Sequence, residues 1–155
     1  MGELLMKQKA LSLKESYELY SGDELKYFIQ RRKLMTKKPA YDIFTEEGVV
    51  ASAEVTNATA PLVYKLKFGE ADAGEVRFDE IPGVNKLIYE AKEIEIDGNS
   101  ILSEFSIKDK DKKIIGTVKK KLVSMKDTYD IQFADDKDEL LFAMLALLID
   151  ETFHG

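Results

Sequence analysis

The sequence predicts an all-β protein with one helix: a closed antiparallel barrel of about twelve strands around a buried hydrophobic C-terminal helix. Three observations support this prediction, namely short strand-like runs separated by turns, an internal repeat, and an unbroken apolar run near the end of the chain. The 155 residues fit a single domain, 1–155, with a core of its own. A composition of 45% hydrophobic and 34% charged residues is typical of a globular protein.

Short β-branched or alternating runs are separated by turn residues along most of the chain. We expect hairpins that pair 41–45 with 49–55 around Glu47-Gly48, 62–68 with 75–78 around Gly69 and Gly74, and 87–96 with 101–107 around Asp97-Gly98-Asn99. Turns recur about every 8–12 residues, which is typical of an all-β barrel or sandwich.

An internal repeat relates two parts of the chain. The segment KLMTKKPAYDI, 33–43, matches KLVSMKDTYDI, 121–131, at an offset of 88 with six identities in eleven positions. Two copies with so long a period predict a pseudo-symmetric domain rather than a solenoid. Tyr41 and Tyr129 recur at the same place in the two copies, and core packing with a satisfied hydroxyl explains them better than chemistry does.

The repeat also decides the structure of DELKYFIQRRKLM, 23–35. Taken alone, this segment has apolar residues at helical spacing. Its repeat partner, KIIGTVKKKLV at 113–123, contains β-branched residues and a glycine, which is typical of a strand. Both segments are therefore predicted to be strands.

The chain ends in a run of ten apolar residues, 140–149, rich in Leu, Ala and Met. These residue types favour a helix, predicted at about 136–150, and the acidic residues Asp135, Asp136 and Asp138 suit its start. A helix that is apolar all round must be buried on every side. At about 15 Å the run spans only half the hydrocarbon core of a bilayer, so we expect no transmembrane span. A closed barrel would surround such a helix completely.

Charge and cysteine content exclude several classes of function. The formal net charge of −6 disfavours nucleic-acid binding, because the protein as a whole repels phosphate backbones. The absence of cysteine excludes disulfides, thiolate zinc sites and cysteine nucleophiles, and it fits a reducing compartment. The first residues, MGELLMKQK, lack the pattern of a secretory signal, so we expect a cytoplasmic protein.

The residues also predict that the protein is not an enzyme and has no cofactor or metal. The single histidine, His154, is the penultimate residue, where a catalytic triad would need a frayed terminus to be rigid. Acidic pairs such as Asp135-Asp136 and Asp109 with Asp111 are better explained by helix starts and turns. Neither a nucleotide-binding glycine motif nor a calcium-loop pattern is present.

The candidate binding residues are two triple-basic clusters, Arg31-Arg32-Lys33 and Lys119-Lys120-Lys121, at equivalent places in the repeat. Such clusters can bind phosphates through charge-assisted hydrogen bonds, Arg bidentately and Lys as a point charge. Basic residues at strand ends can instead be solvated charges that discourage aggregation. The repeat establishes that the two clusters are similar and leaves open whether they are adjacent in space.

Several segments together resemble the LURP-one-related family, which is grouped with the Tubby C-terminal domain and the phospholipid scramblases. They are MKQKALSL followed by Tyr17-Glu18-Leu19, the two Lys-Leu…Tyr-Asp-Ile repeats, and the final LALLID. The resemblance extends from Met6 to Phe153. It implies a barrel of twelve strands around a hydrophobic C-terminal helix, with LALLIDETF leaving the barrel and Asp150 near its exit.

The resemblance leaves the function open between binding and structural roles. Tubby-like relatives bind phosphoinositide headgroups through basic surface residues, and scramblases are described as moving lipids between leaflets. No Tubby headgroup motif matches this sequence residue by residue, so no binding residue is transferred. One hypothesis is a module that binds an anionic ligand, such as a phospholipid headgroup, through the basic clusters. The alternative is a structural or protein-interaction domain without a small ligand, and membrane action by the tail is a third hypothesis.

Overall fold

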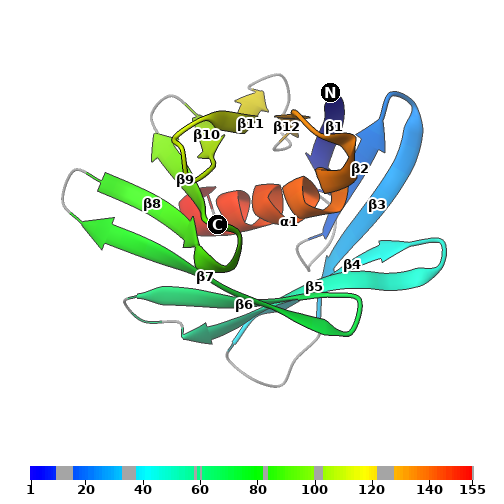
Figure 1. Cartoon of the computed structure of the whole chain (residues 1–155). Coiled ribbons are helices and arrows are strands. Elements are labelled where there is room, and N and C mark those ends of the chain that lie inside the picture. Colours follow the sequence, from blue (N-terminus) through cyan, green and yellow to red (C-terminus); the bar gives the residue numbers. More distant parts are fainter. Residues whose placement is uncertain are drawn as a thin grey trace.

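The computed structural model describes residues 1–9, 16–32, 38–57, 59, 61–81, 84–99, 103–121 and 128–154. It confirms the predicted fold class: twelve antiparallel strands form a closed barrel around one C-terminal helix (Figure 1). The strands are β1 (Gly2–Gln8), β2 (Ser16–Ser21), β3 (Glu24–Arg31), β4 (Ala40–Thr45), β5 (Gly48–Asn57), β6 (Leu62–Phe68), β7 (Ala71–Ile81), β8 (Val84–Tyr89), β9 (Ile94–Asn99), β10 (Glu104–Lys108), β11 (Ile114–Lys121) and β12 (Thr128–Phe133).

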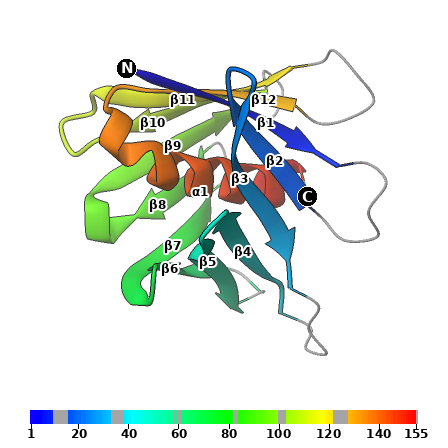
Figure 2. The same ribbon diagram turned by 90° about the vertical axis from the view of Figure 1, so that its right-hand side faces the viewer.

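Each strand pairs with its neighbours in sequence, and pairing of β1 with β12 closes the barrel. The helix α1 (Glu139–Ile149) follows a short 3₁₀ turn, η2 (Asp136–Asp138), and continues into a π-helical turn, η3 (Asp150–His154). Figure 2 shows α1 running across the interior, with the N-terminus of the chain near the start of the helix and the C-terminus at its other end. We call these two ends of the barrel the helix-start end and the helix-exit end.

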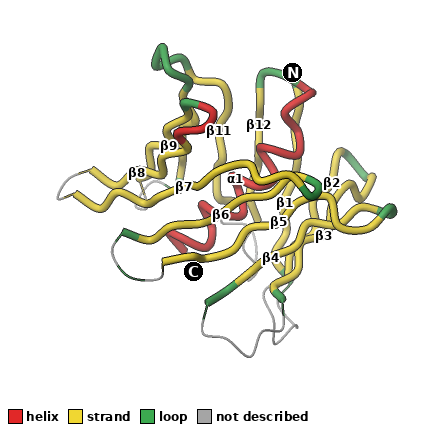
Figure 3. The backbone as a smooth tube through the Cα atoms, turned by 60° about the horizontal axis from the view of Figure 1, so that its bottom comes forward, coloured by secondary structure: helices red, strands yellow, loops and turns green. Residues whose placement is uncertain are grey.

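The helix is apolar on all sides because the strands surround it, as the tube in Figure 3 also shows. All eight residues from Phe142 to Ile149 are buried. The strands contribute alternate residues to the same core: in β1, Leu4 and Met6 point inward, whereas Leu5 and Lys7 lie on the outer face. Burying one such side chain contributes about 1.5–3 kcal/mol, so the helix and the inner faces of the strands depend on each other.

A glycine in the barrel wall makes room for an aromatic side chain of the helix. A Cβ atom added at Gly116 in β11 would lie 2.1 Å from Cε1 of Phe142 and 2.8 Å from the carbonyl oxygen of Gln132. The Phe142 ring cannot move aside, because it is buried and stacked on Phe133 with 5.3 Å between ring centroids. The glycine is therefore required by close packing rather than by a turn.

The start of the helix agrees with the role expected for its acidic residues. The Asp135 side chain accepts a hydrogen bond from the backbone N–H of Lys137, which caps η2. The observed helical segment, 136–154 including its 3₁₀ and π turns, matches the predicted start and extends slightly past the predicted end. In the described part of the chain, no helix combines the length and apolarity that a membrane span requires.

The repeat corresponds to two sets of three strands. The offset of 88 places Ala40–Thr45 (β4) on Thr128–Phe133 (β12), and the preceding strands β2 and β3 correspond to β10 and β11. Segments 24–31 and 114–121 are strands, so the prediction from the repeat is confirmed against the helical alternative. In the barrel the two sets lie on either side of β1.

Two of the expected turns are wrong. Gly74 lies inside β7, where its φ of 91° accommodates an irregular pairing with β6. The expected strand 87–96 is interrupted by a 3₁₀ turn, η1 (Glu90–Lys92), which ends at Glu93 in the left-handed conformation. Asp97-Gly98-Asn99 belongs to β9, where a glycine is needed for packing: a Cβ added at Gly98 would lie 2.8 Å from the rings of Phe105 and Phe153. The connection to β10 falls at 100–102, outside the described residues.

The close contact at Gly116 predicts the effect of a single methyl group. We expect Gly116→Ala to lower the free energy of unfolding by about 1–3 kcal/mol, because overpacking a dense core forces strain. Urea unfolding of this variant and of Thr117→Ala, a change to the neighbouring outward-facing residue, would measure the difference. Equal stability of Gly116→Ala and the wild type would show that the wall and the helix are not packed as described.

Candidate functional site

The two predicted basic clusters lie on β3 and β11, with β12, β1 and β2 between them. Because β3 and β11 are separated by an even number of antiparallel pairings, they run in the same direction. Both clusters therefore lie toward the helix-exit end of the barrel, three strands apart rather than side by side. Lys33 lies outside the described residues.

Each of the three guanidinium nitrogens of Arg32 donates a hydrogen bond to a carboxylate. Its Nη2 and Nε atoms lie 2.7 and 2.9 Å from the Asp42 carboxylate, and its Nη1 atom lies 2.8 Å from Glu54. The hydrogen bonds to Asp42 raise the pKa of Arg32, so the side chain remains charged while it bridges β4 and β5. Arg31 is half-buried and pairs in register with the inward-facing Tyr41. Neither arginine presents an open guanidinium group to the outer wall.

The second cluster divides between the two faces of β11. Lys119 and Lys121 are exposed on the outer face, whereas Lys120 pairs in register with the inward-facing Tyr129. Lys119 makes an ion pair of 3.3 Å with Glu104, in which about half of each side chain is exposed. An ion pair so open to water contributes only about 0–1 kcal/mol, so a stronger anion can replace Glu104.

Closure of the barrel adds a third lysine to this surface. Lys7 of β1 and Lys121 of β11 both pair in register with Thr128 of β12, one from each side. With about 4.8 Å between neighbouring strands, the Cα atoms of Lys7 and Lys121 lie about 10 Å apart. The Lys7 ammonium lies 5.3 Å from the ring centroid of Tyr20. We call Lys7, Lys119 and Lys121 the lysine row; among the described residues, neither Lys7 nor Lys121 pairs with a carboxylate.

A second polar group fastens the end of the helix inside the barrel. We call it the exit cluster: Asp150, Glu151, Tyr17, Tyr41 and Tyr129. Asp150, which is 2% exposed, accepts hydrogen bonds from the hydroxyls of Tyr17 and Tyr129. Glu151 accepts hydrogen bonds from Tyr17 at 2.6 Å and from Tyr41 at 2.5 Å.

The exit cluster compensates for an unfavourable placement of charge. Carboxylates are disfavoured at the negative end of a helix dipole, and burial adds a desolvation cost. The tyrosine hydroxyls satisfy these carboxylates, which confirms the prediction that Tyr41 and Tyr129 are core residues with satisfied hydroxyls. Burial, and then the charges of Asp150 and Glu151, raise the pKa of Tyr17, so that this hydroxyl stays protonated and donates.

The exit cluster therefore has a structural role. Near the other end of the helix, Tyr27 donates a hydrogen bond of 2.8 Å to Glu139, and its pKa is also raised, mainly by burial. Within the described ranges, no three or more His, Cys, Asp or Glu side chains are grouped so that they could hold a metal ion. Tyrosine–carboxylate hydrogen bonds thus hold α1 toward both of its ends.

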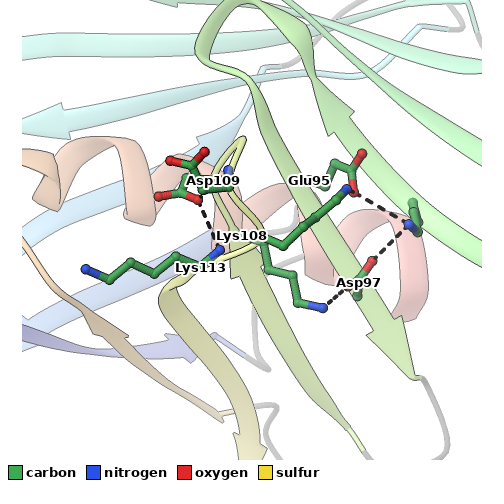
Figure 4. Close-up of polar contacts among 8 residues, drawn as sticks. Glu95, Asp97, Lys108, Asp109 and Lys113 are labelled. Atoms are coloured by element: carbon green, nitrogen blue, oxygen red, sulfur yellow. Dashed lines mark hydrogen bonds and ion pairs between the residues drawn. The ribbon is translucent and has the colours of Figure 1, made fainter.

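The outer wall of β8, β9 and β10 carries a different arrangement of charge, drawn in Figure 4. Lys108 lies 2.7 Å from Asp97, and Lys112 lies 2.8 Å from Glu95. Lys86 lies about equally far from both carboxylates, at 3.5 and 3.6 Å. These lysines are already paired, so this wall offers an anion less than the lysine row does.

Asp109 has the turn role expected from the sequence. Its Oδ1 atom accepts hydrogen bonds from the backbone N–H groups of Asp111, at 2.9 Å, and Lys113, at 3.0 Å. The carboxylate therefore closes the turn between β10 and β11, as aspartate side chains commonly do. Figure 4 shows the second of these bonds beside the ion pairs of the wall.

Comparison with known proteins shows a similarity over the whole chain. The chain is 26% identical over 156 residues to the uncharacterized protein YxjI of Bacillus subtilis (strain 168), and the alignment covers 100% of this chain and 96% of YxjI. No protein-family model and no solved structure matches the chain. The LURP-one-related resemblance therefore stays a prediction.

The raised pKa values of the buried tyrosines predict the course of a base titration. At about pH 11 the tyrosines of the unfolded chain are mostly ionised, whereas Tyr17 and Tyr27 should remain protonated in the folded protein. A raised pKa stabilises the fold below the unfolded value of about 10, and this contribution is lost as the pH rises further. The near-ultraviolet absorbance of tyrosinate measures how many of the seven tyrosines are ionised, in the folded protein without urea and in the unfolded chain with urea.

The variant Tyr17→Phe is the control for this titration. Its folded protein should ionise as many tyrosines at about pH 11 as the wild type does, while its urea-unfolded chain should ionise one fewer. Superimposable titration curves for folded and unfolded wild type would contradict the burial of these hydroxyls.

Proposed function

We propose that the protein is a non-enzymatic binding module that recognises an anionic ligand, a phospholipid headgroup, on the outer wall formed by β11, β12 and β1. The observation that carries the proposal is the lysine row. Barrel closure brings Lys7 to the same wall as Lys119 and Lys121, and two of these three ammonium groups have no carboxylate partner among the described residues.

The energetics favour a phosphate group at a membrane surface. Each lysine close to an anionic bilayer contributes about 1 kcal/mol, so the row supplies about 3 kcal/mol, or a factor of about 100 in affinity. The net charge of −6 opposes approach from a distance. Binding should therefore depend on the local row and fall steeply as salt screens it.

The interior supports a binding role rather than catalysis. The helix fills the lumen that the described strands enclose, with Phe142 to Ile149 all buried. The two carboxylates at its end accept hydrogen bonds from tyrosines whose position in the core is fixed. These two carboxylates therefore position the helix. A ligand can reach the outer wall of the barrel but not the filled lumen.

Vesicle co-sedimentation tests the proposal. Wild-type protein should sediment with vesicles that contain phosphatidylglycerol, phosphatidylserine or a phosphoinositide, and it should stay in the supernatant with phosphatidylcholine alone. We expect the triple variant Lys7→Ala, Lys119→Ala, Lys121→Ala to lose about 100-fold in affinity, and high salt to have a similar effect.

A charge-matched control separates the lysine row from net charge. Lys92, Lys110 and Lys113 are exposed and lie at turns toward the helix-start end. Changing these three residues to Ala alters the net charge by the same amount as the lysine-row variant does. The affinity for anionic vesicles should stay close to that of the wild type. Equal losses in the two triple variants, or no sedimentation of the wild type with any anionic vesicle, would overturn the proposed function. The second outcome would favour a structural or protein-interaction domain.

A further inference from the structure

An open pocket of about 700 Å³ on the outer surface borders the lysine row. Its lining includes Lys121 of the row together with Lys26, and it also includes the acidic residues Glu3, Asp136 and Glu139. Leu5 and Tyr20 line the same pocket. Charges of both signs therefore face one solvent-filled space.

The register orders these groups along β1. Glu3, Leu5 and Lys7 alternate with the inward-facing Leu4 and Met6, so all three lie on the outer face. Tyr20 pairs in register with Leu5, and its ring lies under the Lys7 ammonium. The outer face of β1 is thus acidic at Glu3, apolar at Leu5 and basic at Lys7, and the first two of these residues line the pocket.

Three charged side chains in this pocket have no ion-pair partner among the described residues: the carboxylates of Glu3 and Glu139 and the ammonium of Lys121. Glu139 accepts the hydrogen bond from Tyr27 described above, so Glu3 is the carboxylate left open to a ligand. The other charged groups make weaker or more exposed contacts, with Lys26 at 3.9 Å from Glu24 and Asp136 at 3.6 Å from the amino group of Met1. Glu3 and Lys7 are four residues apart on an extended strand, about 13 Å between Cα atoms. Leu5 and Tyr20 occupy the surface between them.

A site for a simple anion would not carry carboxylates in the same pocket, because they repel a phosphate group. A ligand with both a phosphate and a primary ammonium group satisfies both ends. We infer that the pocket selects phosphate esters that carry a primary amine, of the phosphoethanolamine and phosphoserine type, with the phosphate at the lysines and the ammonium at Glu3. This inference rests on the proposed function, because the phosphate half of the ligand is held by the lysine row.

Phosphate esters that carry a primary amine occur both as headgroups of membrane lipids and as free compounds. Two measurements distinguish these two sources. Vesicles that contain phosphatidylserine or phosphatidylglycerol at equal mole fraction carry the same net charge, so their difference reports the ammonium and carboxylate of the serine headgroup, and the Glu3 variant below assigns it to the ammonium. Calorimetric titration with glycerophosphoserine and glycerophosphoglycerol makes the same charge-matched comparison without a membrane. Preference for the amine in both measurements assigns recognition to the headgroup itself, and preference with vesicles alone assigns it to the membrane surface.

In each of the two comparisons, we expect wild-type protein to bind the amine-bearing compound with about fivefold higher affinity. This is the ratio that one exposed ion pair supplies. Glu3→Gln should abolish this preference while leaving the affinity for phosphatidylglycerol vesicles unchanged or slightly higher. The control Glu47→Gln removes an exposed carboxylate at the turn between β4 and β5 and should keep the preference.

Two negative results have different meanings. Equal binding of phosphatidylserine and phosphatidylglycerol vesicles, still dependent on the lysine row, would overturn the selection for amines and leave the proposed function intact. A preference that survives in Glu3→Gln would also overturn it, because the ammonium would then be recognised elsewhere. Failure of every anionic vesicle to bind would overturn the proposed function itself, and this inference with it.

Discussion

The structure depends on one constraint: a helix that is apolar on every face must be enclosed on every side. Phe142 to Ile149 are all buried, and a sheet of strands that closes on itself covers them. Pairing of β1 with β12 completes this enclosure. The same pairing removes the exposed sheet edges that would invite aggregation, and it brings Lys7 to the same outer wall as Lys121, with β12 between them. The enclosed core and the candidate binding surface therefore both depend on the pairing of β1 with β12.

The helix is held by polar contacts as well as by packing. Apolar contacts alone leave its position along the barrel axis weakly fixed, because one turn of similar side chains can replace another. Asp150 and Glu151 break this degeneracy, since their carboxylates are stable inside the barrel only where Tyr17, Tyr41 and Tyr129 donate hydrogen bonds. The buried charges thus select one position of the helix, at the cost of placing two carboxylates at the unfavourable end of its dipole.

Features governed by local patterns were predictable from the sequence, and features governed by distant contacts were not. The apolar run identified the helix, and the repeat identified β3 and β11 as strands. The turn expected at Asp97-Gly98-Asn99 is wrong because Gly98 serves the packing of Phe105 and Phe153, which no local pattern reveals. Likewise, Lys7 joins Lys121 only through barrel closure, although the predicted closure combined with strand alternation could have pointed to it. Arg32 looked available in the sequence, but its guanidinium nitrogens donate hydrogen bonds to Asp42 and Glu54.

Native-state hydrogen exchange of the amides in α1 tests most directly whether the helix is the core around which the barrel closes. If it is, the amides of Phe142 to Ile149 exchange only through global unfolding, with the same opening free energy as the slowest amides of β1 and β12. Exchange of the helix through an opening of distinctly lower free energy, with the strands still protected, would show that the barrel stands without it and would contradict the mutual dependence of helix and wall.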